Sequence, residues 1–211
     1  MNTTLDPAAG QRHGAHCVHL TISVSQNCIP SFLGLVRGGF AVHVTVGCSL
    51  QDLLSSQLGI DENYLRDRVQ TIFLNNSPVD DTAGTTVGDG ATISLSAAMP
   101  GLNGAVMRKG GVLASLRRSI SLLPGDEGIE PRPGSITLKL FNLVAKEIGP
   151  VFLVKGIVVK GRALAEVLAM QTPQFWQNVK QVEIDNVRCD AEQLRFLDMS
   201  TREVCLQVRP A

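Results

Sequence analysis

The sequence has few aromatic residues and no excess of charge of either sign. Its 211 residues include one Trp, one Tyr and seven Phe, so a buried core must be mainly aliphatic. Nineteen Lys and Arg residues balance nineteen Asp and Glu residues, and the formal net charge is therefore zero. Binding to a nucleic-acid backbone or an anionic membrane surface depends on an excess of positive charge. We therefore expect neither nucleic acid nor membrane as a partner.

Long apolar runs and paired cysteine motifs are also missing. No stretch of about 18 uninterrupted apolar residues is present, which excludes a membrane-spanning helix. The first sixteen residues are polar and lack the apolar block of a signal peptide. The five cysteines are odd in number and contain no C-x-x-C pair, so they fit neither a disulfide framework nor an iron–sulfur site. We expect a cytoplasmic protein with reduced cysteines.

Motifs for catalysis and cofactor binding are absent as well. The sequence contains no G-x-S-x-G, H-E-x-x-H, Walker A or G-x-G-x-x-G pattern. The adjacent acids Asp61-Glu62 and Asp80-Asp81 stand at the ends of expected elements, and we interpret them as turn and cap residues. We therefore predict no catalytic residue, no cofactor and no enzymatic activity.

Hydrophobic patterning predicts an α+β fold in the first half of the chain. Alternating apolar and polar residues predict strands at residues 17–25, 40–46, 69–74 and 91–96. Ser49 is placed to cap a helix over residues 50–58, which Gly59 ends. The segment 25–39 contains Pro30 and Gly38-Gly39 and is expected to be a connector between two strands.

The second half of the chain looks like a diverged copy of the first. The matched positions are Val18/Leu20/Ile22 with Ile136/Leu138/Leu140, Pro30/Phe32 with Pro150/Phe152, Leu54 with Leu168, Asn76 with Asn186, and Asp80 with Asp190. Two α+β segments with similar generic patterning are the alternative to duplication. Duplication predicts a flexible N-terminus at 1–16, a first unit at 17–104, a short helix and Pro/Gly linker at 105–134, and a second unit at 135–211.

The alternation and the repeat together predict which side chains are buried. The expected core is Leu20, Ile22, Val44, Leu53, Leu54, Ile72, Leu74, Ile93 and Leu95, with copies Leu138, Leu140, Val158, Val167, Leu168, Val182, Ile184, Val204 and Leu206.

Three runs in the first half carry a family resemblance. They are SLQDLLSSQLGI, VQTIFLNNSPVDD and TTVGDGATISLSAAMPG, within residues 17–101. Together they resemble the ubiquitin-like β-grasp sulfur carriers, such as the small subunit of molybdopterin synthase and the thiamine sulfur carrier. The resemblance extends to the second half only through the repeat. It implies two β-grasp units in tandem, each a mixed sheet with one helix on one face.

The end of the chain departs from that family. The carriers use a free C-terminal Gly-Gly, whereas this chain continues far beyond Gly101 and ends in Arg209-Pro210-Ala211. Our first hypothesis is therefore a non-catalytic protein-interaction module that retains the β-grasp scaffold. The second is a sulfur-carrier precursor that is activated by cleavage after Gly110-Gly111. The alternative interpretation of this pair is a flexible joint before a short helix over residues 112–120.

Three groups of residues are candidate sites. An interaction face for a protein partner, or for a second copy of the chain, is expected at Cys17, His19, Thr21, His43 and Thr45, which are small or weakly polar. A basic patch for an anion or a partner is expected at Arg108, Lys109, Arg117 and Arg118, unless these residues form an ordinary solvated face. The third hypothesis is a metal-binding protein that uses His16, Cys17 and His19, but their spacing matches no zinc motif and we predict no metal.

Overall fold

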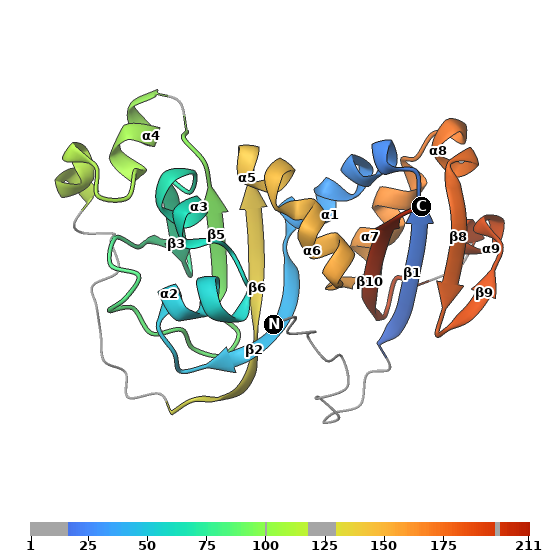
Figure 1. The fold of residues 1–211 in the computed structure, drawn as a ribbon, viewed down its shortest axis with the longest axis horizontal. Helices are drawn as coiled ribbons and strands as arrows, with labels where there is room; N and C mark the ends of the chain where they lie inside the picture. The colour runs from blue at the N-terminus through green and yellow to red at the C-terminus, as the bar shows by residue number, and fades with distance from the viewer. Residues whose placement is uncertain (1–16, 100, 118–129, 197–198) are drawn as a thin grey trace. The chain divides into compact units, whose positions relative to one another are not determined.

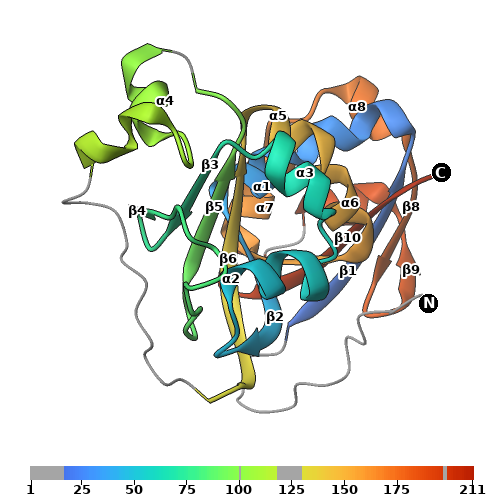
Figure 2. The ribbon, with the colours of Figure 1, turned by 60° about the vertical axis from the view of Figure 1, so that its left-hand side comes forward.

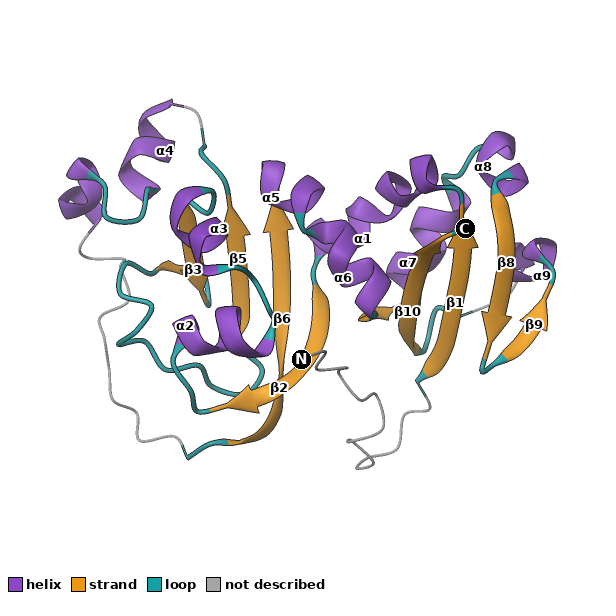
Figure 3. Ribbon diagram, viewed as in Figure 1, coloured by secondary structure: helices purple, strands orange, loops and turns teal. Residues whose placement is uncertain are grey.

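The computed structural model describes residues 17–99, 101–117, 130–196 and 199–211. The described residues form an α+β protein with ten strands and several helices (Figure 3). The chain divides into two compact units (Figure 1). Unit 1 consists of Met1–Leu35 together with Pro150–Ala211, and unit 2 consists of Val36–Gly149. These units differ from the boundaries expected from the sequence, because unit 1 is built from both ends of the chain.

Unit 2 contains one mixed sheet with the strand order β4-β3-β5-β6-β2. Its strands are β2 (Phe40–Val46), β3 (Thr71–Leu74), β4 (Ser77–Pro78), β5 (Thr92–Ser96) and β6 (Arg132–Phe141). β5 and β6 are parallel, and the other pairs are antiparallel. Helix α2 (Leu50–Asp52), the π-helical turn η2 (Leu53–Gln57) and α3 (Glu62–Asp67) lie on one face of this sheet (Figures 1 and 2).

Three further helical segments complete unit 2. They are α4 (Gly101–Met107), the 3-10 helix η3 (Val112–Arg117) and α5 (Asn142–Glu147). Helices α4 and η3 pack against each other as a short hairpin that follows β5 in the chain (Figure 2). The helix expected at residues 112–120 is thus present as η3 over its first six residues, and its remainder lies outside the described residues.

The five strands of unit 1 have the order β7-β10-β1-β8-β9. Its strands are β1 (Val18–Val24), β7 (Ile157–Lys160), β8 (Val179–Ile184), β9 (Val187–Cys189) and β10 (Glu203–Pro210). β1 and β10 are parallel, and the other pairs are antiparallel. Helix α7 (Gly161–Ala169) packs against β7, and α8 (Pro173–Gln177) and α9 (Ala191–Phe196) pack against β8.

The connector at residues 25–39 is helical. It forms the 3-10 helix η1 (Gln26–Phe32) and helix α1 (Leu33–Gly38). Pro30 lies inside η1, where the short 3-10 turn tolerates it, and Ile29 and Phe32 are buried. The matching connector of the second repeat is α5 followed by α6 (Gly149–Lys155).

The first strand of each half of the chain pairs with strands of the other half. β1 pairs with β10 and β8, which lie near the C-terminus, and β6 pairs with β2 and β5, which precede it in the chain. We call this arrangement the strand exchange.

Two features of local geometry occur in both units. Asn75 and Asn76 have φ of 51° and 67° in the turn between β3 and β4, and Asp185 and Asn186 have φ of 49° and 65° between β8 and β9. Positive φ at both central residues is typical of the tight hairpin turn that Asn and Asp favour. Gly39 and Gly156 precede β2 and β7 with φ of 108° and 109°, a conformation that side chains rarely adopt. The Ser49 cap is also confirmed, because its Oγ accepts a hydrogen bond from the Asp52 amide at 3.0 Å.

Most of the predicted core is buried. Of the expected residues, only Val44, Val158 and Ile184 are half-buried rather than buried. In β7 the buried side chains are Ile157 and Val159, so the alternation is shifted by one residue from the predicted face. A four-residue apolar strand gives no clear alternation from which the buried face could be predicted.

Candidate functional site

The interaction face expected from the sequence is divided between the two units. Cys17 and Thr21, which are half-buried, and His19, which is exposed, belong to unit 1, where β1 pairs with β8 and β10. His43 and Thr45 are exposed on β2 in unit 2. The prediction assumed that β1 and β2 are neighbours in one unit, and the strand exchange removes that arrangement.

The backbone of Thr45 is already paired with a side chain. The Gln57 amide accepts a hydrogen bond from the Thr45 N–H at 2.8 Å and donates one to its carbonyl at 3.0 Å. Gln57 thus fills the hydrogen-bonding positions that an added strand would use at this point of β2.

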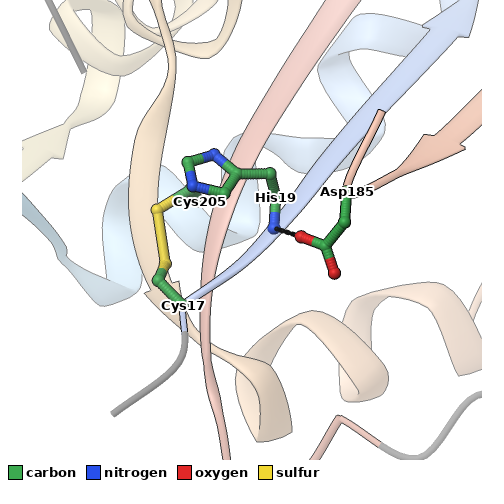
Figure 4. The surroundings of a disulfide bond; sticks show 4 residues. All are labelled: Cys17, His19, Asp185 and Cys205. Carbon is green, nitrogen blue, oxygen red and sulfur yellow. Dashed lines mark hydrogen bonds between the residues drawn. A yellow bond between two sulfur atoms is a disulfide. The ribbon is translucent and has the colours of Figure 1, made fainter. Parts of the chain in front are cut away.

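Two of the five cysteines form a disulfide, which corrects the prediction that all cysteines are reduced. Cys17 precedes β1 and is bonded to Cys205 in β10, with Cα atoms 6.1 Å apart (Figure 4). An odd count excludes a complete disulfide framework, but it does not exclude one pair beside the three free thiols of Cys28, Cys48 and Cys189. The cysteines therefore no longer support the inference of a reducing compartment.

The same bond removes Cys17 from the metal hypothesis. Its sulfur is no longer a thiolate ligand, and His16 lies outside the described residues. His19 is exposed, and its amide donates to Asp185 Oδ1 at 2.9 Å (Figure 4). Among the residues that the structure describes, no group of three or more His, Cys, Asp or Glu side chains could hold a metal ion.

Gly110-Gly111 forms the turn that joins α4 to η3. The Gly110 amide donates to Asp80 Oδ1 at 2.9 Å, and Gly110 has a φ of 60°. The Gly111 amide donates to the Arg108 carbonyl at 3.1 Å, and the Ala114 amide donates to the Gly111 carbonyl at 2.9 Å. The pair is a hydrogen-bonded connection between two helices rather than an extended tail.

Arg117 anchors this hairpin to the loop after β4. Its side chain is 1% exposed and pairs with Asp80 Oδ1 at 2.7 Å, while its Nε donates to the Val106 carbonyl at 2.8 Å. One guanidinium thereby links the loop after β4, the end of α4 and η3 itself. Arg117 was expected in a surface patch, and its burial shows that it has a structural role instead.

The other members of the predicted basic patch differ from one another in their surroundings. Arg108 is exposed and hydrogen-bonds the Gln70 side chain. Lys109 is half-buried and donates from Nζ to the Leu65 carbonyl at 3.1 Å. Burial lowers the pKa of Lys109. Arg118 lies outside the described residues.

The adjacent acids have the roles of turn and cap residues with one exception. Asp61 accepts from the Tyr64 amide at 2.9 Å and caps α3. Asp81 Oδ1 accepts from the Ala83 and Gly84 amides at 3.1 Å and 2.9 Å. Asp80 instead binds Gly110 and Arg117. Burial on its own raises the pKa of Asp80, but the Gly110 amide and the Arg117 guanidinium outweigh it and hold that pKa below its usual value.

The anchored hairpin exposes three large apolar side chains. Leu102 is 70% exposed, Val112 is 97% exposed and Leu116 is 69% exposed. Nine large apolar side chains are exposed among the described residues. These three are the ones that lie within residues 101–117. Sequence patterning indicated an apolar helix at 112–120, but it could not show that Val112 and Leu116 point away from the sheet.

A hollow of about 260 Å³ lies beside the hairpin in unit 2. Its walls include the apolar side chains of Leu54, Leu65 and Ile72 and the charged side chains of Glu62, Arg66 and Lys109. Lys109 belongs to the hairpin segment, so the hollow and the hairpin share a wall. An apolar side chain with a nearby carboxylate fits this combination of surfaces.

Comparison with known protein families, with characterised proteins and with solved structures finds no match for this chain. Among the described residues, no helix is both long enough and apolar enough to cross a membrane.

Proposed function

We propose that the protein is a non-catalytic interaction module built from two ubiquitin-like, β-grasp units. Each unit has a parallel central pair of strands flanked by antiparallel strands, and helices connect β2 to β3 and β7 to β8. These shared features support the scaffold part of the proposal. The order of the central pair differs between the units, because β6 lies beside β2 in unit 2, whereas β10 and not β1 lies beside β7 in unit 1.

The α4–η3 hairpin is the proposed binding site for a partner protein. The observation that carries this assignment is the exposure of Leu102, Val112 and Leu116 on a segment that Arg117 holds in place. A fixed apolar surface loses little conformational freedom when a partner covers it, and the burial of that surface favours association.

The charges around the hairpin indicate the kind of partner. Arg108 is exposed in the segment that joins α4 to η3, and Lys109 lines the neighbouring hollow. A protein segment with apolar side chains and flanking carboxylates would complement both features. The partner is therefore proposed to be an acidic, amphipathic protein segment.

Glutamate substitutions at the exposed positions test this site. A partner captured from native cells is purified, and its affinity is measured for the parent protein and for Val112→Glu with Leu116→Glu. We expect at least a tenfold loss, because a loss of about 1.4 kcal/mol corresponds to a factor of ten and two anchors are removed. Val187→Glu on β9 is the matched control, because Val187 is 67% exposed in the other unit.

Two outcomes would contradict the proposal. Equal affinities for the hairpin variant and the control would exclude the hairpin as the binding site. Loss of affinity in His19→Glu with Thr45→Lys, but not in the hairpin variant, would assign binding to the residues first expected from the sequence.

The sulfur-carrier precursor remains a separate proposal with its own measurement. Cleavage after Gly111 would leave a fragment that ends in that glycine, and conversion to a thiocarboxylate would replace one oxygen by sulfur. The intact mass of the protein from its native cell distinguishes this chemistry from the interaction module, which requires only the full-length mass.

A further inference from the structure

The first half of the chain supplies a central strand to unit 1. β1 pairs over its full length with β10, from Val18 opposite Val204 to Val24 opposite Pro210. On its other side it pairs with β8, where Leu20 is opposite Ile184. Leu20, Ile22 and Val24 are completely buried in this position. Unit 1 therefore requires residues from before and after the linker.

The second half supplies a central strand to unit 2 in the same way. β6 pairs with β2, from Phe40 opposite Leu138 to Val46 opposite Arg132, and with β5, where Ile93 is opposite Leu138. Leu138 and Leu140 are completely buried. A cut between η3 and β6 would thus leave two fragments that are joined through both sheets.

A covalent bond reinforces this connection. Cys17 belongs to the first fragment and Cys205 to the second, and their disulfide spans 188 positions of the chain. Both cysteines are half-buried, so a small thiol reductant can reach them. In that reaction a dithiol attacks one sulfur and then its own mixed disulfide, so that two cysteine thiols form and the reductant becomes a disulfide.

We infer that the chain remains a single particle after a cut between its repeats, and that the fragments can separate only when Cys17–Cys205 is reduced and both sheets unfold. The strand exchange and the disulfide carry this inference, which does not depend on the proposed partner site. A consequence is that cleavage alone cannot release the first repeat.

A protease site inserted between Leu123 and Pro124 of the full chain tests the inference. Cleavage is followed on a reducing denaturing gel until the intact band has disappeared. We expect the cut protein to elute from a sizing column at the volume of the uncut protein, and to give one band on a non-reducing gel and two bands on a reducing gel. Separation on the native column, or two bands without reductant, would overturn the inference.

Cysteine variants separate the covalent connection from the strand exchange. Cut Cys17→Ser protein is expected to remain one native particle but to give two bands on the non-reducing gel. Cys189→Ser is the matched control and is expected to behave as the parent, because Cys189 is a free thiol. Separation of cut Cys17→Ser protein under native conditions would show that the exchanged strands do not hold the fragments.

A relocated cross-link tests the position of β6 without relying on the native disulfide. Ala41 in β2 and Thr137 in β6 are opposite each other. In Cys205→Ser protein, Ala41→Cys with Thr137→Cys is expected to restore the single band after oxidation and cutting. Failure of this pair to cross-link would contradict the placement of β6 beside β2.

Discussion

Asp80 connects three segments of unit 2 through a single carboxylate. It accepts hydrogen bonds from Gly110 and Arg117, while Lys109 contributes a nearby positive charge. The Arg117 end of this pair is buried, but the Asp80 side chain is 39% exposed. Solvent screens a pair of this kind in part, so its contribution lies below that of a fully buried ion pair.

The stability of the hairpin should depend on pH through this carboxylate. The folded-state pKa of Asp80 lies below its unfolded value, so the stabilisation is complete above the unfolded pKa and is lost as the pH falls through the folded one. Asp80→Asn should cost roughly 1 kcal/mol near neutral pH after allowance for screening, and less in acid.

Thermal midpoints of the parent and Asp80→Asn, measured from pH 7 down to acid, test this prediction. The two curves are expected to converge at low pH. Asp67→Asn serves as control, because its carboxylate pairs with Arg66 on the exposed surface of α3. A difference between the parent and Asp80→Asn that stays constant down to strong acid would exclude the carboxylate as the cause.

At the scale of elements, the two hairpin turns act as equivalent clamps in the two units. Asn75 Oδ1 accepts from the Thr92 amide at 2.9 Å and holds the start of β5. Asp185 Oδ1 accepts from the His19 amide at 2.9 Å and holds β1. In unit 2 the strand before the turn, β3, pairs with β5. In unit 1 the corresponding strand, β8, pairs with the exchanged strand β1.

Alanine substitutions in these clamps should destabilise one unit at a time. Asn75→Ala and Asp185→Ala each remove a side-chain hydrogen bond and place alanine at positive φ, at a cost of about 1–2 kcal/mol. Asn76→Gly and Asn186→Gly are the controls and should be close to neutral, because glycine is favoured at the second position of this turn.

Amide hydrogen exchange gives the unit-specific result for the clamp variants. Asn75→Ala is expected to weaken protection in unit 2, beginning at Thr92, and Asp185→Ala in unit 1, beginning at His19. Equal loss of protection across both units in either variant would contradict independent clamps.

The same turns show which part of the fold can be predicted from sequence. Asn-rich turns, the Ser49 cap and the alternation of β1 depend on neighbouring residues, and the sequence indicates them directly. The pairing of β1 does not depend on neighbours: Val18, Leu20 and Ile22 have the same pattern as Ile136, Leu138 and Leu140. Local pattern therefore cannot distinguish which of the two strands enters which sheet.

The sequence predicted which segment contains the candidate site, but not how its residues are arranged. The sequence singled out Gly110-Gly111 and the basic residues around it, but it assigned Arg117 to the surface. The ion pair with Asp80 joins positions 37 residues apart. Nothing in the sequence near either residue indicates this contact.

At the scale of the whole molecule, unit 2 is a continuous segment and unit 1 is not. All strands of unit 2 lie within Val36–Gly149, a length typical of an independent domain. Unit 1 must join β1 to β10 across most of the chain. Closing so long a loop is slow, so unit 2 is expected to form first during folding.

Two excised segments of the chain should differ in their ability to fold. A protein that consists of residues 36–149 retains β6 and should fold cooperatively, whereas residues 17–104, the first unit expected from sequence, should not. The shorter segment lacks Ile136, Leu138 and Leu140, which are at most 1% exposed in the sheet of unit 2. At roughly 2 kcal/mol for each buried side chain, their loss removes about 6 kcal/mol, which is comparable with the whole stability of a small domain. Dispersed amide spectra and a sigmoidal urea transition are expected for 36–149 only. Should 17–104 fold cooperatively, β1 would have taken the position of β6, and the strand exchange would be one of two arrangements open to this chain.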